Sequence, residues 1–262
     1  MIRFNHKPGL VAYITCGDPD LATTEQIVLA AIDAGADVIE LGVPFSDPVA
    51  DGPVIQRASE RALKSKTSLA QVIELASKVR RARSQAGLII FSYWNPVLRF
   101  GLKRFCDSAH DAGIDGALIT DLTVEESAEY AAAMRAKDLA TIFLAAPTST
   151  DERLRAIAQA STGFVYAVSR TGITGTQKQL SDDAQQLVNR IRKYTHLPLA
   201  VGFGISNAEQ FATVGAFADA AVIGSAIVQI VGEDGSRAPA RVAEFIRGLR
   251  AEAGKNWALA HP

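Results

Sequence analysis

Short apolar runs rich in β-branched residues recur along the chain, and amphipathic segments separate them. The runs span residues 10–15, 38–41, 88–93, 117–120, 140–145, 164–168, 199–201 and 220–223. Because they are apolar throughout instead of alternating, they are typical of parallel strands that are covered on both faces. Eight such strands with helices between them are what a closed parallel barrel needs. The sequence therefore predicts an α/β fold, a single (β/α)8 TIM barrel that takes up residues 1–262 as one domain.

Local signals support this alternation of strands and helices. Two of the separating segments begin with the spacing of a capping box, Thr23 before Gln26 and Ser68 before Gln71. Three segments of similar sequence come directly before predicted strands: Ala-Gly-Ala-Asp at 34–37, Ala-Gly-Ile-Asp at 112–115 and Ala-Phe-Ala-Asp at 216–219. In the first two segments, we expect the glycine to end the preceding helix in a left-handed conformation.

The order of the segments leaves one other architecture open, an open doubly wound sheet. That fold would need a glycine-rich loop after the first strand, and the sequence Cys-Gly-Asp-Pro at 16–19 fits such a loop poorly. No low-complexity or Pro/Ser-rich linker divides the chain. About 50 residues separate the starts of the second and third runs, which leaves room for a long loop after Glu40. In barrel enzymes, loops at the C-terminal ends of strands carry the chemistry.

Composition excludes several classes of function. The 27 basic residues nearly cancel the 28 acidic ones, which leaves no basic field for a nucleic-acid backbone. Cys16 and Cys106 are too few for a disulfide scaffold or a zinc site and indicate a reducing compartment. The N-terminus lacks the features of a signal peptide, and no apolar stretch approaches the ~18 residues of a membrane span. We therefore expect a cytoplasmic protein without a nucleic-acid or membrane partner.

The strongest signal for catalysis is the stretch at 40–53, with the sequence ELGVPFSDPVADGP. Glu40 ends an otherwise apolar run, so its carboxylate is expected to project into the mouth of the barrel. There, loss of water raises the pKa of a carboxyl toward that of a general acid or base. An isolated glutamate would more often cap the amides of a neighbouring loop. The stiff loop that follows, with Asp47, Asp51 and three prolines, favours catalysis instead.

Glycine clusters follow the last three predicted strands and indicate an anion site. They are Gly172 with Gly175, Gly202 with Gly204, and Gly224 with Ser225 at the start of a helix. Glycines let backbone N–H groups approach phosphate oxygens, and a helix N-terminus adds partial positive charge. Each cluster alone would indicate a turn, whereas three after successive strands predict a phosphate site. We expect backbone amides and the Ser225 hydroxyl to bind the phosphate, since Arg170 is the one cation that adjoins these clusters.

The remaining residue types narrow the chemistry. The predicted strand ends offer no lysine for a Schiff base and no cluster of metal ligands. The histidines fall away from this face of the barrel: His6, His110, His196 and His261. This leaves carboxylate acid–base chemistry on a phosphorylated substrate, without a cofactor. Side chains that could line a slot for a flat apolar group, but that fit the barrel core equally well, are Tyr13, Phe91, Tyr93, Leu118, Leu144, Tyr166 and Phe203.

Several short motifs are spread over nearly the whole chain, from about Leu10 to beyond Val231. They are YITCGDP at 13–19, PFSDPVADGPVIQ at 44–56, DLTVEE at 121–126, SRTGITG at 169–175, GFGIS at 202–206 and GSAIV at 224–228. On these motifs the chain resembles the tryptophan synthase α-subunit family, for which the second motif is close to diagnostic. The resemblance implies a TIM barrel lyase that cleaves indole-3-glycerol phosphate into indole and glyceraldehyde 3-phosphate in L-tryptophan biosynthesis.

The resemblance also implies roles for individual residues. Glu40 matches the proton shuttle of the family, and Asp51 matches the carboxylate that hydrogen-bonds the indole N–H. Tyr166 matches a substrate-contacting tyrosine. The gate and phosphate positions are matched by Thr174, Gly175, Gly204, Gly224 and Ser225. The loops that face a PLP-dependent β subunit in an α2β2 complex are matched at Asp47, Asp121 and Thr123, and the α chain itself carries no cofactor.

The sequence departs from the family pattern in four places. Thr123 stands where the family usually has proline, which makes this loop less rigid and should weaken coupling to a partner. Ala12 and Cys16 replace a common proline and a common alanine. The usual N-terminal helix is cut to a few residues, so we expect the lower end of the barrel to be less well covered. Two alternatives stay open, a stand-alone indole-glycerol phosphate lyase and a catalytically degenerate scaffold barrel for a β-type partner.

Overall fold

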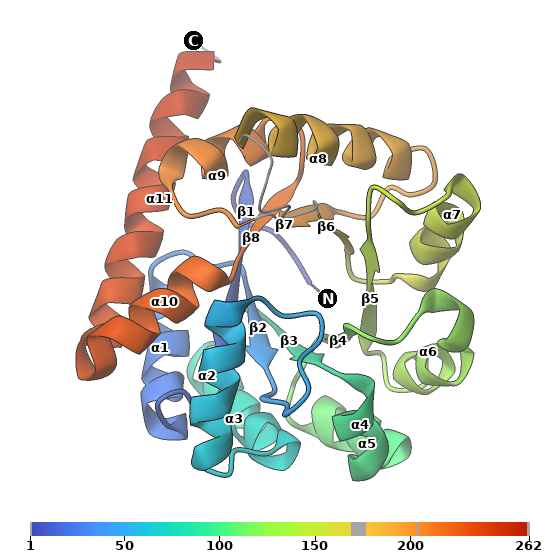
Figure 1. Ribbon diagram of the computed structural model, residues 1–262, viewed down its shortest axis with the longest axis vertical. Coiled ribbons are helices and arrows are strands. Elements are labelled where there is room, and N and C mark those ends of the chain that lie inside the picture. The colour runs from blue at the N-terminus through green and yellow to red at the C-terminus, as the bar shows by residue number, and fades with distance from the viewer. Residues whose placement is uncertain (1, 169–176, 203, 261–262) are drawn as a thin grey trace.

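The computed structural model describes residues 2–168, 177–202 and 204–260, and for 177–181 and 252–260 it describes the backbone alone. Within these residues, eight parallel strands hydrogen-bond in chain order and close into a barrel. Figure 1 shows the helices as a ring around the strands. The fold is therefore the predicted TIM barrel, and the closed sheet excludes the open doubly wound alternative.

The apolar runs of the sequence are the strands of the barrel. The strands are β1 Gly9–Thr15, β2 Val38–Gly42, β3 Gly87–Ser92, β4 Gly116–Ile119, β5 Ala140–Ala145, β6 Val165–Val168, β7 Leu199–Gly202 and β8 Ala220–Ile223. The helices are α1 Leu21–Asp33, α2 Pro53–Lys64, α3 Leu69–Ala82, α4 Trp94–Phe100, α5 Leu102–Asp111, α6 Ala128–Arg135, α7 Asp151–Ala160, α8 Gln177–Ile191, α9 Ala208–Gly215, α10 Ser225–Asp234 and α11 Ala238–Ala260, with 3-10 turns η1 Val124–Glu126 and η2 Gly235–Arg237. Each predicted strand is present, with bounds within about one residue of the prediction.

The helix α11 packs along one side of the barrel, against α1, α9 and α10 (Figure 1). In the part of the chain that the structure describes, no helix, α11 included, combines the length and apolar character needed to cross a membrane.

Buried side chains form two layers, one on each side of the barrel wall. The inner layer runs along the barrel axis and includes Val38 and Ile89. The outer layer lies between strands and helices and includes Ile39 and Leu41 of β2. Because successive residues of a strand face opposite sides, Glu40 shares the inner side with Val38. The alternation within β2 therefore directs the Glu40 carboxyl into the barrel.

Helix starts follow the local signals with one exception. Ser68 is the N-cap of α3, and the Gln71 side chain accepts a hydrogen bond from the Ser68 backbone N–H at 3.0 Å. The predicted capping box at Thr23 is wrong. Asp20 is the N-cap of α1, and its carboxylate accepts from the Thr23 N–H at 2.7 Å. A carboxylate three residues earlier therefore caps this helix, and Thr23 lies inside it.

The N-terminal segment closes the lower end of the barrel, where the strands begin. Ile2 is buried in the axial core, and the ring of Phe4 packs edge-on against Phe164 with centroids 6.0 Å apart. Phe4 also lies over Gly9, where an added Cβ would come within 2.3 Å of the ring. Two apolar side chains therefore cover the barrel axis at this end.

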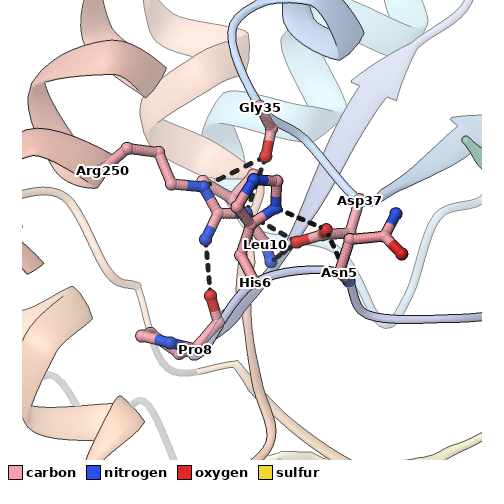
Figure 2. A network of polar contacts seen from close by, with 7 residues as sticks. All are labelled: Asn5, His6, Pro8, Leu10, Gly35, Asp37 and Arg250. Atoms are coloured by element: carbon pink, nitrogen blue, oxygen red, sulfur yellow. Dashed lines mark hydrogen bonds and ion pairs between the residues drawn. The ribbon is translucent and has the colours of Figure 1, made fainter. Parts of the chain in front are cut away.

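An aspartate in front of β2 ties together three parts of the lower end (Figure 2). The buried Asp37 carboxylate accepts hydrogen bonds from the backbone N–H of Leu10 in β1 at 2.8 Å and from Arg250 of α11 at 2.6 Å. Arg250 also donates to the carbonyls of Gly35 and Pro8. Gly35 has the predicted left-handed conformation, with a φ of 109°. This network joins the chain start, the α1–β2 turn and the last helix.

The same network recurs in front of β4. Asp115 accepts from the backbone N–H of Leu88 in β3 at 2.9 Å and from Arg80 of α3 at 2.6 Å. Arg80 also donates to the carbonyls of Gly113, before β4, and of Ala86, before β3. In the first network, the two carbonyls likewise lie before β2 and β1. Gly113 is again left-handed, with a φ of 73°. The arrangement is therefore an internal repeat, built from the related segments at 34–37 and 112–115.

A third copy lies in front of β8, and the position in front of β6 differs. Asp219 accepts from the backbone N–H of Leu199 in β7 at 2.8 Å and pairs with Arg192. Before β6, Thr162 replaces the aspartate, and its hydroxyl accepts from the backbone N–H of Thr141 in β5 at 2.9 Å. Each odd-numbered strand is thus tied at its start to the residue that leads into the next strand.

At the strand pair β5 and β6, where Thr162 takes the place of the aspartate, the described residues form no ion pair equivalent to that of Arg80 and Asp115. Arg135 of α6, the helix before β5, instead lines a cavity of about 440 Å³ together with Asp138 and His110. The cavity lies beside the starts of β4, β5 and β6, at the lower end of the barrel and away from the C-terminal ends of the strands. It marks the place where the repeated network is incomplete.

Asp37→Asn should lower the free energy of unfolding by about 3 kcal/mol, because it leaves the largely buried guanidinium of Arg250 without its counter-charge. Asp33→Asn is the matched control, since Asp33 pairs with Arg83 where both side chains are far more exposed. The control should change stability much less. Urea unfolding followed by circular dichroism measures both, and equal losses would contradict a special contribution from the buried network.

Candidate active site

Glu40 lies in β2 with its carboxyl inside the barrel, as the sequence predicts. The residue is 1% exposed, and neither carboxyl oxygen has a hydrogen-bond partner among the described residues. Burial raises the pKa of Glu40 from 4.5 to about 8. Near neutral pH the group is therefore mostly a protonated acid. It caps none of the backbone amides that the structure describes.

Asp51 lies in the loop between β2 and α2, where Tyr93 binds it. The Tyr93 hydroxyl donates to Asp51 Oδ2 at 3.1 Å and accepts from the Ala50 backbone N–H at 3.0 Å. Gln56 donates to the Asp51 carbonyl at 2.8 Å. Burial raises the pKa of Asp51 to about 6, and the hydrogen bond from Tyr93 opposes this rise. Near pH 7, Asp51 is therefore ionised while Glu40 is not, the separation that acid–base chemistry with two carboxyls needs.

Two tyrosines on the inner side of the barrel lie close to these carboxyls, each over a glycine of the next strand. A Cβ built on Gly42 would come within 2.4 Å of the Tyr13 hydroxyl, and one on Gly202 within 2.4 Å of the Tyr166 hydroxyl. Burial raises the pKa of both tyrosines, and the charges of the two carboxyls add to the effect. This role of the glycines was not predicted from the sequence. Tyr13 is paired in register with Glu40 and Tyr166 with Ala200, and in each case the glycine stands two residues further along the strand. An alignment of neighbouring strands would therefore have indicated these glycines.

The other residues predicted to line an apolar slot differ in exposure. Phe91 packs edge-on against Tyr13 with centroids 4.9 Å apart. Phe91, Leu144 and Tyr166 are partly exposed, whereas Leu118 is completely buried in the axial core. Of this set, the partly exposed side chains are therefore the ones with surface left for a ligand.

The predicted phosphate residues are described in part. Ser225 is the exposed first residue of α10, and Gly224 is the N-cap of that helix. Gly204 has a φ of 75°, and no atom lies within 4 Å of a Cβ built on it. Outside the described residues lie Arg170, Gly172, Thr174, Gly175 and Phe203. Ser225 therefore presents a hydroxyl and a helix start at the end of β8, on the side where Asp51 lies.

The described histidines lie away from this face, as predicted. His6 binds the buried aspartate in front of β2 at the lower end (Figure 2). His110 stands near the end of α5, and His196 precedes β7. Among the residues that the structure describes, no group of three or more His, Cys, Asp or Glu side chains could hold a metal ion.

The loops predicted to face a partner carry exposed polar and apolar side chains. Asp47 is exposed, and Thr123 is the N-cap of η1 with a φ of −74°. Asp121 is exposed and accepts a hydrogen bond from the first backbone N–H of α4. Within the described residues, the large apolar side chains that protrude most are Val49 and Leu98, which are 85% and 53% exposed. These two residues were not predicted from the sequence, because an exposed apolar residue is recognised from its surroundings.

Comparison with known proteins identifies the barrel. A family model described as tryptophan synthase alpha chain matches residues 2–254. The chain belongs to the tryptophan synthase alpha chain family. The tryptophan synthase alpha chain of Solibacter usitatus is 50% identical over 251 residues, which cover 95% of this chain and 94% of that one. That of Geotalea uraniireducens is 45% identical over 247 residues, 94% of this chain and 92% of that one.

Solved structures of tryptophan synthase share the same barrel. A chain of the Pyrococcus furiosus tryptophan synthase α2β2 complex matches with a TM-score of 0.88 at 38% identity, covering 94% of this chain and 98% of that one. A chain of Mycobacterium tuberculosis tryptophan synthase matches with a TM-score of 0.86 at 34% identity, covering 94% of this chain and 93% of that one. Both similarities extend over nearly the whole tryptophan synthase alpha chain fold.

The raised pKa of Glu40 predicts how its replacement changes stability with pH. Between about pH 4.5 and 8 the folded protein keeps a proton that the unfolded chain releases, so this group lowers stability as pH rises. Glu40→Gln removes that dependence. Relative to wild type, the variant should gain stability from pH 5 to pH 8, by at most about 1.4 kcal/mol per pH unit. Urea unfolding across this range measures the difference, and a constant offset would contradict the raised pKa.

Proposed function

We propose that the chain is a tryptophan synthase α subunit that cleaves indole-3-glycerol phosphate into indole and glyceraldehyde 3-phosphate. The observation that carries the proposal is the pair of unlike carboxyls at the barrel mouth. Glu40 is buried and has no partner among the described residues, while Asp51 is kept ionised near neutral pH with help from Tyr93. A buried, unpartnered carboxyl costs stability, which argues against the scaffold alternative.

The two carboxyls divide the chemistry between them. Protonated Glu40 donates its proton to C3 of the indole ring, which turns the ring into a cationic indolenine. Ionised Asp51 accepts a hydrogen bond from the indole N–H and stabilises this cation more strongly as the charge develops. The Glu40 carboxylate then accepts the proton of the glycerol hydroxyl, and the carbon–carbon bond breaks in retro-aldol fashion. The proton donated first is thereby replaced, so Glu40 ends the turnover as it began.

The remaining site residues would place the substrate. The indole ring would lie against Phe91, Leu144 and Tyr166, the partly exposed members of the predicted apolar wall. The phosphate would bind backbone amides near Gly204 and the Ser225 hydroxyl, at the start of α10. Other positions stay predictions for the same site: Tyr13, Tyr93 and Leu118 in the apolar wall, Thr174 and Phe203 over the substrate, and Gly175 and Gly224 at the phosphate.

We propose in addition that the chain works with a β subunit in an α2β2 complex. The Pyrococcus furiosus structure is described as such a complex, in which mutual activation occurs. The loops with Asp47, Asp121 and Thr123 would face the partner, and the protruding side chains of Val49 and Leu98 favour a covered surface over a stand-alone lyase. The chain itself would need no cofactor, with PLP chemistry left to the β subunit. A cytoplasmic location and a single domain over residues 1–262 belong to this proposal.

The kcat/KM for indole release should depend on pH as a bell. Activity should fall below about pH 6, where Asp51 is protonated, and above about pH 8, where Glu40 is ionised.

Glu40→Gln should reduce the rate at least ~100-fold, because an amide fills the same volume but moves no proton. Asp51→Asn should cost on the order of 100-fold, because a neutral amide does not balance the ring charge.

Indole release from indole-3-glycerol phosphate by the purified chain measures these rates. Glu60→Gln provides the matched control, since Glu60 is an exposed residue of α2 and the exchange is the same. It should keep wild-type activity. Residual activity of Glu40→Gln within tenfold of wild type would contradict the role of Glu40 as proton donor.

Thr123→Pro should strengthen activation by a β subunit and leave the isolated chain nearly unchanged. The φ of −74° suits proline, and the Thr123 N–H donates to no acceptor among the described residues. Proline would reduce the number of open loop conformations, so ordering the loop against a partner would cost less entropy. The ratio of indole-releasing rates with and without β subunit tests this. An unchanged or smaller ratio in the variant would show that the substitution is neutral.

A further inference from the structure

Tyr93 is the side chain that fixes the position of Asp51. It stands directly after β3, at the N-cap of α4. Its hydroxyl donates to Asp51 Oδ2 at 3.1 Å and accepts from the backbone N–H of Ala50 at 3.0 Å. A single oxygen therefore holds both the carboxylate and the loop that carries it. A shift of Tyr93 would move Asp51 relative to the substrate.

The backbone around Tyr93 is held by the neighbouring β4–η1 loop. Tyr93 provides no side-chain cap for α4, so the first N–H of this helix needs an acceptor from elsewhere. Asp121 supplies it: its Oδ1 accepts from the Trp94 backbone N–H at 2.6 Å. One residue earlier, the Thr120 backbone N–H and hydroxyl donate to the Ser92 carbonyl at 2.9 and 3.3 Å. The peptide groups on both sides of Tyr93 are thus bound by one loop.

We propose that Asp121 is a positioning residue for the reaction, which acts through the Trp94 N–H and Tyr93 to hold Asp51 in place. This inference rests on the proposed function of the site. It gives Asp121 a role within the chain, whereas the sequence resemblance places it in a loop that faces a partner. Because Thr123 stands two residues further in the same loop, a displacement of this loop reaches Asp51 through the same contacts.

A helix cap of this kind contributes to stability on its own wherever it occurs. The chain offers a matched example, since Asp20 accepts from the Thr23 N–H at the start of α1 at 2.7 Å. Among the described residues, Asp20, which precedes α1, has no hydrogen bond to Asp51, whereas Tyr93, which precedes α4, donates one to it. Asp20→Ala therefore measures the loss of a cap without the loss of Asp51 positioning.

The first test is kinetic. Asp121→Ala should lower kcat for indole release about tenfold or more with a smaller change in KM, because a carboxylate displaced by about 1 Å supports the transition state poorly. Asp121→Asn keeps an oxygen acceptor for Trp94 and should retain activity within about threefold. Asp20→Ala should stay within about twofold. Tyr93→Phe should also lose activity, and adding Asp121→Ala to Tyr93→Phe should cost little more, since both act on the same contact.

The second test needs no activity, so it separates this inference from the proposed function. Carbon-13 NMR of aspartate-labelled protein, with Asp51→Asn to assign the signal, follows the pKa of Asp51. Loss of the Tyr93 hydrogen bond should raise that pKa above about 6 in Tyr93→Phe and in Asp121→Ala. Loss of the Asp121 charge alone would lower it, and Asp121→Asn isolates that effect. The tyrosines that interact with the Asp51 charge, Tyr13, Tyr93 and Tyr166, are not substituted in any Asp121 variant.

The outcomes separate clearly. An unchanged or lowered Asp51 pKa in Asp121→Ala overturns the inference, as does an equal kinetic loss in Asp20→Ala. Full additivity of Asp121→Ala and Tyr93→Phe would show that Asp121 acts by another route. If the wild-type chain releases no indole, the proposed function fails, while the Asp51 pKa still decides whether Asp121 positions the carboxylate.

Discussion

The hydrogen bond from the start of each odd-numbered strand to the side chain in front of the next strand is the contact on which the barrel depends. The donors are the backbone N–H groups of Leu10, Leu88, Thr141 and Leu199. Because side chains alternate along a strand, a register shift of one residue would turn every inward side chain outward. Glu40 points into the barrel because Asp37, three residues earlier, fixes where β2 begins against β1. The lower end of the barrel thus decides which side chains meet at the mouth.

Strong contacts at the lower end offset unfavourable ones at the mouth. The buried pair of Asp37 and Arg250 is surrounded by further hydrogen bonds, the condition under which a buried ion pair is favourable. At the mouth, Glu40 lacks a partner among the described residues, and Gly42 and Gly202 leave room for tyrosine hydroxyls. A buried carboxyl without a partner and glycines within strands both lower stability, and such features are expected where a protein has given up stability for chemistry. The lower end of the barrel therefore contributes stability, while the mouth carries the groups that chemistry needs.

The sequence predicts the features that are local and fails for those that are not. Unbroken apolar runs locate the strands within about one residue, because a strand covered on both faces leaves that pattern directly. Glu40 and Asp51 stand out because charged residues interrupt or follow such a run. The contact of Arg250 with Asp37 spans 213 positions and was not foreseen. The Thr23 prediction failed because the spacing rule does not weigh a competing cap at Asp20.

Tyr93 is the point at which two separate loops meet. From the side of β2, the loop reaches it through the Ala50 N–H and Asp51, directly after the protruding Val49. From the side of β4, it is reached through the bond of Asp121 to the start of α4. A surface that covers Val49 and one that contacts the Asp121 loop would therefore act on the same hydroxyl. Since Tyr93 also opposes the rise in the Asp51 pKa, any such contact would alter both the place and the charge of this carboxylate.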